Sequence, residues 1–275
     1  MALGEESTEH RSTVAAILIE SVNTRAPVAP CPAGHIKMSA DVQAAIRIST
    51  RTPWIRTTLS GGNAVIDLPS ACIAGISLHD APLDHARFTG ADLREANFQN
   101  ATGIYALFGG ANLFGSYFTD ADLEDADFSD ADLSTSVAYK ADLEDANFSR
   151  ATLRKIRLSG ATLKFARFGA AVLHEAELSD TVLNGAWMNG AQLRRASMKH
   201  ADLSDANLEA ADLTEADLQS ADLRHANLSG AKLVGANLKG VHLGKTRLTN
   251  ADLTGTGLTR DDLVGAEITG AVGIL

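Results

Sequence analysis

The feature that most limits the fold of this chain is a repeat of five residues. Ten-residue blocks such as ADLREANFQN, ADLEDADFSD and ADLSDANLEA each hold two copies of the pattern A-(D/N)-(L/F)-x-x. The register runs from about Ile66 to about Gly270 without an insertion, which gives about 41 copies. A period of five fits neither a helix nor a long strand, so the backbone must turn every few residues.

The spacing inside one unit predicts which side chains form the core. The Ala and the Leu or Phe lie two positions apart, which places them on the same face of an extended backbone. We therefore expect these two side chains to point inward, and the Asp or Asn and the last two residues to point outward. One unit buries too little to be stable, whereas stacked coils bury a continuous column, so the pattern predicts a solenoid.

These units resemble the pentapeptide-repeat family, in which Leu or Phe is the central residue and Ala comes before it. The resemblance covers about three quarters of the chain. It implies an all-β fold, a right-handed quadrilateral β-helix with four units per coil. About ten coils at roughly 4.8 Å each would form a rod near 50 Å long. The segment ADVQAAIRISTR is similar to a stretch that precedes the repeats in some actinobacterial members, which predicts a bacterial protein.

The phenylalanines agree with a coil of twenty residues. One wall of the column carries Phe at every twentieth position from Phe88 to Phe168, and another carries Phe98 and Phe118 followed by Ala138. Ala138 lies across from Phe128, so a small residue faces a large one and we expect the core volume to be roughly kept. We interpret these phenylalanines as packing residues.

Residues 1–60 do not show the repeat and form a separate segment before the repeat domain, residues 61–275. We expect two short helices in this segment that cap the solenoid or pack on its first coils. The first helix carries Val14, Ile17, Leu18 and Val22; the second starts at Ser39, carries Val42, Ala45 and Ile46, and ends before Pro53. At the other end the pattern weakens at Asp261. The apolar end AVGIL suggests end-to-end pairing of two copies, with a frayed terminus as the alternative.

The composition indicates a soluble cytoplasmic protein. The two cysteines, Cys31 and Cys72, do not form a disulfide framework, and we expect two free thiols in a reducing compartment. The first residues are acidic and polar, so no signal peptide is predicted. The apolar runs are far shorter than the roughly 20 residues of a membrane span, so no membrane role is predicted.

No motif in the chain indicates catalysis. The sequence contains no P-loop, dinucleotide fingerprint or nucleophile elbow. The outward Asp residues do not converge as calcium ligands do. We therefore expect no enzyme activity, cofactor or metal. No metal-ligand spacing with Cys or carboxylates occurs among the histidines, which are His10, His35, His79, His85, His174, His200, His225 and His242.

Charge is distributed unevenly along the repeats. From Asp120 to Asp145 there are ten acids and one base, and from Arg150 to Arg167 there are six bases and no acid. Like charges stacked on neighbouring coils are destabilising. The acidic belt is therefore our candidate protein-binding surface, and a merely solvated face is the alternative. Its residues are Asp122, Glu124, Asp125, Asp142, Glu144 and Asp145.

Other charges are expected to pair one coil apart and to stabilise the stack. The expected pairs are Lys155–Glu175, Glu175–Arg195, Arg195–Glu215, Asp212–Lys232, Lys232–Asp252, Arg157–Glu177, Asp130–Arg150 and Glu144–Lys164. Outward apolar residues near the acidic belt form a candidate contact patch, either for a partner or for the N-terminal helices. They are Ile104, Tyr105, Leu107, Phe114, Tyr117, Val137 and Tyr139.

Two functions are consistent with these observations. The first is a non-enzymatic interaction protein or scaffold with an unknown protein partner. The second rests on resemblance to the topoisomerase-poison-resistance members of the family, which mimic DNA and bind gyrase. The net charge of −10 disfavours direct binding of nucleic acid. The solenoid alone carries 29 acids and 18 bases, about one net charge per 4–5 Å, against one per 1.7 Å in duplex DNA. This low density and the absence of loop insertions weaken the second hypothesis.

Overall fold

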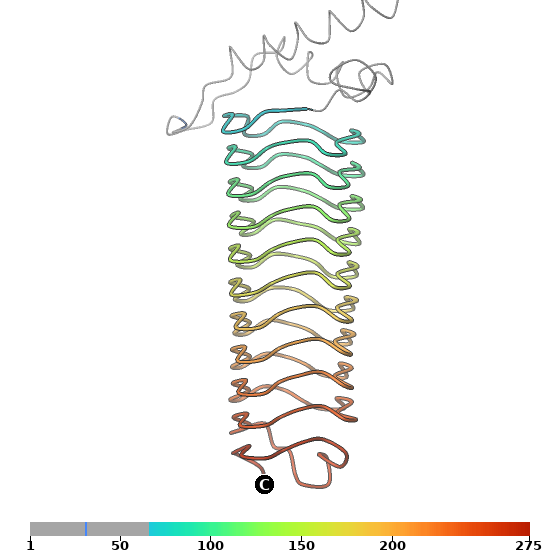
Figure 1. The fold of residues 1–275 in the computed structure, drawn as a ribbon, viewed down its shortest axis with the longest axis vertical. Coiled ribbons are helices and arrows are strands. Elements are labelled where there is room, and N and C mark those ends of the chain that lie inside the picture. Colours follow the sequence, from blue (N-terminus) through green and yellow to red (C-terminus); the bar gives the residue numbers. More distant parts are fainter. Residues whose placement is uncertain (1–30, 32–65) are drawn as a thin grey trace, which may run out of the picture.

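The computed structural model describes residue 31 and residues 66–275, whose backbone winds into coils stacked along one axis (Figure 1). This part of the chain has no helix and no continuous strand. Neighbouring coils are joined by single parallel β-bridges, each between residues twenty apart, from Asp67–Arg87 to Asp252–Val272. The predicted coil of twenty residues is confirmed.

The bridges form four ladders along the axis, one for each unit of a coil. We name the walls by the first residue of each ladder: wall 1 begins at Asp67, wall 2 at Cys72, wall 3 at Ser77 and wall 4 at Pro82. The two turn residues that follow a ladder residue are assigned to the same wall. Outward side chains at positions twenty apart are therefore neighbours on one wall.

The unit centred on Leu143 explains why the chain turns every five residues. The N–H of Leu143 donates to the carbonyl of Thr162, at 2.8 Å, and the N–H of Asp145 donates to that of Lys164, at 2.9 Å. The carbonyl of Leu143 accepts the N–H of Ala146, at 3.2 Å, which closes a β-turn. Asp145, the third residue of this turn, has φ of 57°, as a type II turn requires. Gly, Asn and Asp tolerate this conformation best, which accounts for their frequency at the fifth position.

The inward side chains form one continuous core. Phe128 stacks on Phe108 at 4.8 Å and on Phe148 at 5.0 Å, measured between ring centroids. Phe98 and Phe118 stack at 4.7 Å, and Phe118 meets Phe128 edge to face at 5.9 Å. Both arrangements are favourable for aromatic rings. The predicted aromatic ladder is therefore confirmed.

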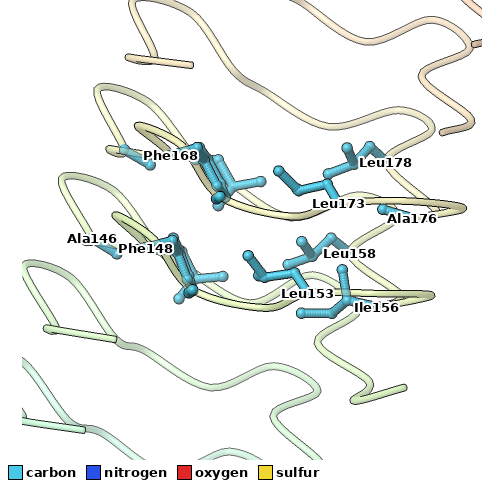
Figure 2. Packing of buried hydrophobic residues seen from close by; sticks show 14 of the residues in the cluster. Ala146, Phe148, Leu153, Ile156, Leu158, Phe168, Leu173, Ala176 and Leu178 are labelled. Carbon is cyan, nitrogen blue, oxygen red and sulfur yellow. The ribbon is translucent and has the colours of Figure 1, made fainter. Parts of the chain in front are cut away.

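Leucines fill the core beside the phenylalanines, in the same coils as Phe148 and Phe168. Figure 2 shows Leu153 lying against Leu173, and Leu158 against Leu178, in neighbouring coils. All four of these side chains are fully buried. The repeat thus stacks residues of the same type one coil apart. Each such coil therefore buries a similar apolar surface against the coil before it.

The expected balance of volumes around Ala138 is incomplete. An apolar cavity of about 10 Å³ lies at this residue, and Phe118, Phe128, Phe148 and Ile156 contribute to its lining. A site of this size and lining stays dry. Phe128 therefore does not fully compensate for the missing side chain at Ala138, because both neighbours of Phe128 in its stack hold its ring in place.

The ladders are interrupted near the C-terminal end. Within the described residues, wall 3 ends with the bridge Asp217–Asn237 and wall 4 with Asp222–His242. Asp261 is exposed, in agreement with the weakened pattern there. The exposed apolar side chains nearby include Val272 and Leu275. Pairing of two copies through this end stays a prediction.

One disulfide joins Cys31 to Cys72, the first ladder residue of wall 2. The Cα atoms lie 5.6 Å apart, within the range of such bonds. The prediction of two free thiols is therefore wrong, while the cytoplasmic localisation stays a prediction. The two expected helices lie outside the described residues. No helix in the described part of the chain is long and apolar enough to cross a membrane.

Candidate interaction surface

All six residues of the acidic belt lie on wall 4. Asp122 and Asp142 are paired directly by a β-bridge, and the turn residues that follow them, Glu124 and Asp125, lie one coil from Glu144 and Asp145. The fold therefore gathers six carboxylates on two neighbouring coils, a height of about 10 Å. The predicted belt is thus a compact part of a single wall.

Some basic residues next to the acidic belt form ion pairs, whereas the six acids of the belt do not do so among the described residues. Arg150 bonds to Asp130 at 2.6 Å, and Lys155 lies 3.4 Å from Glu175. By contrast, no ion pair within residues 66–275 contains any of the six wall 4 acids. Within residues 66–275, no ion pair therefore offsets the negative charge of the acidic belt.

Of the other ion pairs expected from the sequence, some form and some do not. Arg157–Glu177 and Arg195–Glu215 form, as do the two pairs named above. Glu175–Arg195, Asp212–Lys232, Lys232–Asp252 and Glu144–Lys164 do not occur among the ion pairs of the described residues, although bridges stack the two pairs that contain Lys232. Long exposed side chains gain little from pairing, so stacking alone does not impose it.

Acids at the second position of a unit have a structural role that the sequence analysis did not include. The carboxylate of Asp142 accepts the backbone N–H of Glu144 at 3.2 Å, and that of Asp127 accepts the N–H of Ser129 at 3.0 Å. Such a bond stabilises the turn. Glu124 and Glu144, at the fourth position, have no such bond and are the better positions at which to alter charge without altering the fold.

The crowding of acids affects ionisation on wall 4. Partial loss of water raises the pKa of the Glu124 carboxyl, and the charges of its neighbours, Asp125 first, raise it further. The pKa of Tyr105 is also raised, because its hydroxyl hydrogen-bonds to the Asp125 carboxylate and the negative charge there opposes its ionisation. Glu215 is the opposite case, since its hydrogen bond to Arg195 lowers its pKa.

We expect Glu124→Gln to stabilise the protein at pH 7 and Glu215→Gln to destabilise it. The folded chain holds a proton on Glu124 more tightly than the unfolded chain does, so ionisation of Glu124 opposes folding. Glu215 has the lowered pKa, and its contribution is present above the unfolded pKa and lost as pH falls. Urea denaturation at pH 7 and near pH 3 measures both effects; at the lower pH the gain in Glu124→Gln should vanish and the loss in Glu215→Gln should shrink. An equal loss of stability in the two variants at pH 7 would contradict this account.

The predicted apolar patch is divided among three edges of the solenoid. Ile104 and Tyr105 are turn residues of wall 4, and Leu107 is the next ladder residue, on wall 1. Phe114, Tyr117 and Val137 lie where wall 2 meets wall 3, and Tyr139 is a turn residue of wall 3, on the side that leads into wall 4. The structure therefore does not bring the seven residues together as one patch.

Two further exposed aromatic residues were missed by the sequence analysis. Phe165 is a turn residue of wall 4 and is 45% exposed, and Trp187 is a ladder residue of wall 1 and is 55% exposed. Their signal was present, because a Phe at the fifth position or a Trp at the second position of a unit must point outward. The described part of the chain contains no group of three or more His, Cys, Asp or Glu placed to hold a metal ion.

Comparison with known proteins identifies the family. The model of the pentapeptide repeats matches the chain in overlapping segments that together span residues 71–270. No match was found among curated proteins. HetL from the cyanobacterium Nostoc sp. strain PCC 7120, a pentapeptide repeat protein involved in heterocyst differentiation regulation, is 31% identical, with a TM-score of 0.57. That match covers 76% of this chain and 85% of HetL.

A second solved structure also matches the chain. A trypsin-treated variant of QnrB1, a plasmid-mediated fluoroquinolone resistance protein, is 20% identical, with a TM-score of 0.48. The match covers 76% of this chain and 91% of QnrB1. The matched repeats and the similarity to HetL imply a right-handed β-helix. The chain belongs to the pentapeptide-repeat family.

Proposed function

We propose that this protein is a non-enzymatic interaction protein that binds a protein partner through the charged outer surface of its β-helix. The observation that carries the proposal is the set of six wall 4 acids without an ion pair among the described residues. Stacked like charges reduce stability, so a purely structural role does not account for them. Pentapeptide repeat proteins are generally non-enzymatic, and the role of HetL in regulation supports action through contact.

Affinity capture with a charge-reversed wall tests this proposal. We expect the wild-type chain to retain a protein partner that the variant Glu124→Lys/Glu144→Lys loses. Asp120→Lys/Asp180→Lys is the matched control, because these exposed acids lie on wall 3 and Lys140 occupies the same turn position between them. Mass spectrometry of the eluates compares the three proteins. A partner retained equally by the wall 4 variant would contradict the role of this wall.

DNA mimicry toward a type II topoisomerase is the second candidate. Six carboxylates within about 10 Å correspond to roughly one charge per 1.6 Å, close to the 1.7 Å of duplex DNA. The density applies to wall 4 of two coils and not to the whole solenoid. The proposed partner in this case is DNA gyrase, and the proposed consequence is resistance to topoisomerase poisons.

A supercoiling assay distinguishes the second candidate from the first. If the protein mimics DNA, micromolar protein should inhibit supercoiling by gyrase or protect gyrase from a fluoroquinolone. Glu124→Lys/Glu144→Lys should then abolish the effect, and the wall 3 control should retain it. No effect of the wild-type protein would exclude gyrase as the partner and leave the first candidate in place.

A further inference from the structure

Exposed large apolar side chains gather along one edge of the solenoid. Tyr105 and Phe165 lie in the turns of wall 4, and Leu107 and Trp187 lie on the adjoining ladder of wall 1. We call this line the 4/1 edge. Large exposed aromatic residues are uncommon on a polar surface and are enriched in the centres of protein interfaces.

The apolar residues of the 4/1 edge form two groups with acids between them. Tyr105 and Phe165 occupy the same turn position three coils apart, a distance of about 14 Å. Asp125 and Asp145 occupy that position on the two intervening coils. The other four residues of the acidic belt lie beside them on the same two coils. A ligand along this edge would therefore meet an aromatic ring, a strongly negative segment and a second aromatic ring in turn.

The two aromatic residues are held in place from one side. The Tyr105 ring stacks on His85 at 5.3 Å, with an angle of 7° between the ring planes. The Phe165 ring lies over Gly185 in the next coil, where an added Cβ would come within 2.6 Å of the ring. Both side chains nevertheless remain about half exposed. They are therefore positioned before any partner binds, which lowers the entropic cost of binding.

The opposite edge provides an internal comparison. Phe114 and Tyr117 are 43% and 44% exposed, much like Phe165, but they have no stacked acids between them. Tyr139, a turn residue of wall 3, donates to Glu177 at 3.5 Å, and Glu177 pairs with Arg157. Two edges thus carry exposed aromatic residues, and only the 4/1 edge combines them with acids that have no ion pair among the described residues.

We propose that the 4/1 edge binds a basic protein segment that carries an apolar residue at each end, about 14 Å apart. Arginine suits this surface because its guanidinium pairs with carboxylates and stacks on aromatic rings. The apolar residues of the segment contact Tyr105 with Leu107 at one end and Phe165 with Trp187 at the other. The inference rests on the proposed function and specifies its contact surface and the chemistry of its partner.

Selection from a phage-displayed library of random 16-residue peptides tests this inference on the full chain. We expect the enriched peptides to be rich in Arg or Lys, with apolar residues on both sides of the basic stretch. Phe165→Ser/Trp187→Ser should weaken binding of these peptides at least 10-fold, measured by fluorescence anisotropy. Phe114→Ser/Tyr117→Ser, the matched variant on the opposite edge, should change the Kd less than 2-fold. Circular dichroism establishes that both variants are folded.

Three results would overturn the inference. Enriched peptides that bind the Phe165→Ser/Trp187→Ser variant as well as the wild type would show that another surface is used. An equal loss of peptide binding in the two double variants would show that binding is not specific to the 4/1 edge. Selection without enrichment would mean that the edge does not bind such segments. The proposed function is tested separately, because the capture experiment with Glu124→Lys/Glu144→Lys does not depend on these peptides.

Discussion

Replacing Phe128 by Ala is expected to cost about 3–5 kcal/mol in the free energy of unfolding. The side chain is 1% exposed and stacks between Phe108 and Phe148. Its removal breaks both stacks and enlarges the cavity beside Ala138. The surrounding rings cannot close the space, because each is fixed by its own neighbours in the adjacent coils. Urea denaturation followed by circular dichroism measures the loss.

Phe165→Ala is the matched control for this prediction. It removes the same ring from a turn, where the side chain is 45% exposed. Surface substitutions of this kind usually change stability by about 0.5 kcal/mol or less. If the two variants lost similar amounts, the stacked rings would not be the main support of the column, and the account of the core would be wrong.

Loss of the disulfide is expected to lower the free energy of unfolding about as much as Phe128→Ala does. The bond joins residues separated by 41 positions, and a closed loop of this length contributes about 4 kcal/mol in the chain-entropy description. Cys72→Ser should lower the free energy of unfolding by about this amount, and Cys31→Ser should match it. Addition of a reductant should bring the wild type to the level of the variants.

A thiol titration checks the bond itself. The denatured, unreduced protein should contain no reactive thiol, because the described structure pairs both cysteines. Two reactive thiols under these conditions would contradict the bond and remove the basis for the predicted loss of stability.

The fold was predictable because the coils before the C-terminal interruption obey the same local rule. An inward Ala and Leu or Phe two positions apart, followed by a turn with positive φ, specifies each unit, and twenty-residue stacking follows from the Phe positions. The ion pair Arg150–Asp130 was predictable for the same reason, because its partners are one coil apart. The placement of the six belt acids on neighbouring coils was likewise predictable from spacing, whereas their role as a binding surface stays a prediction.

Features that depend on two walls at once were harder to predict. Tyr105 and Phe114 are close in sequence but lie on opposite edges, whereas Phe165 and Trp187 adjoin across one edge although their units differ. Proximity along the sequence therefore grouped the wrong apolar residues. The disulfide could not be predicted because Cys31 lies outside the repeat, where the period gives no position.

The most direct test of the central claim is carboxylate footprinting of the protein alone and with its captured partner. Carbodiimide-activated amine labelling, read by mass spectrometry, reports the accessibility of each acid. We expect the partner to protect the wall 4 carboxylates, Glu124 and Glu144 above all, while Asp120 and Asp180 on wall 3 label as before. Protection on wall 3, or none on wall 4, would contradict the claim that this protein acts through the acidic wall of its β-helix.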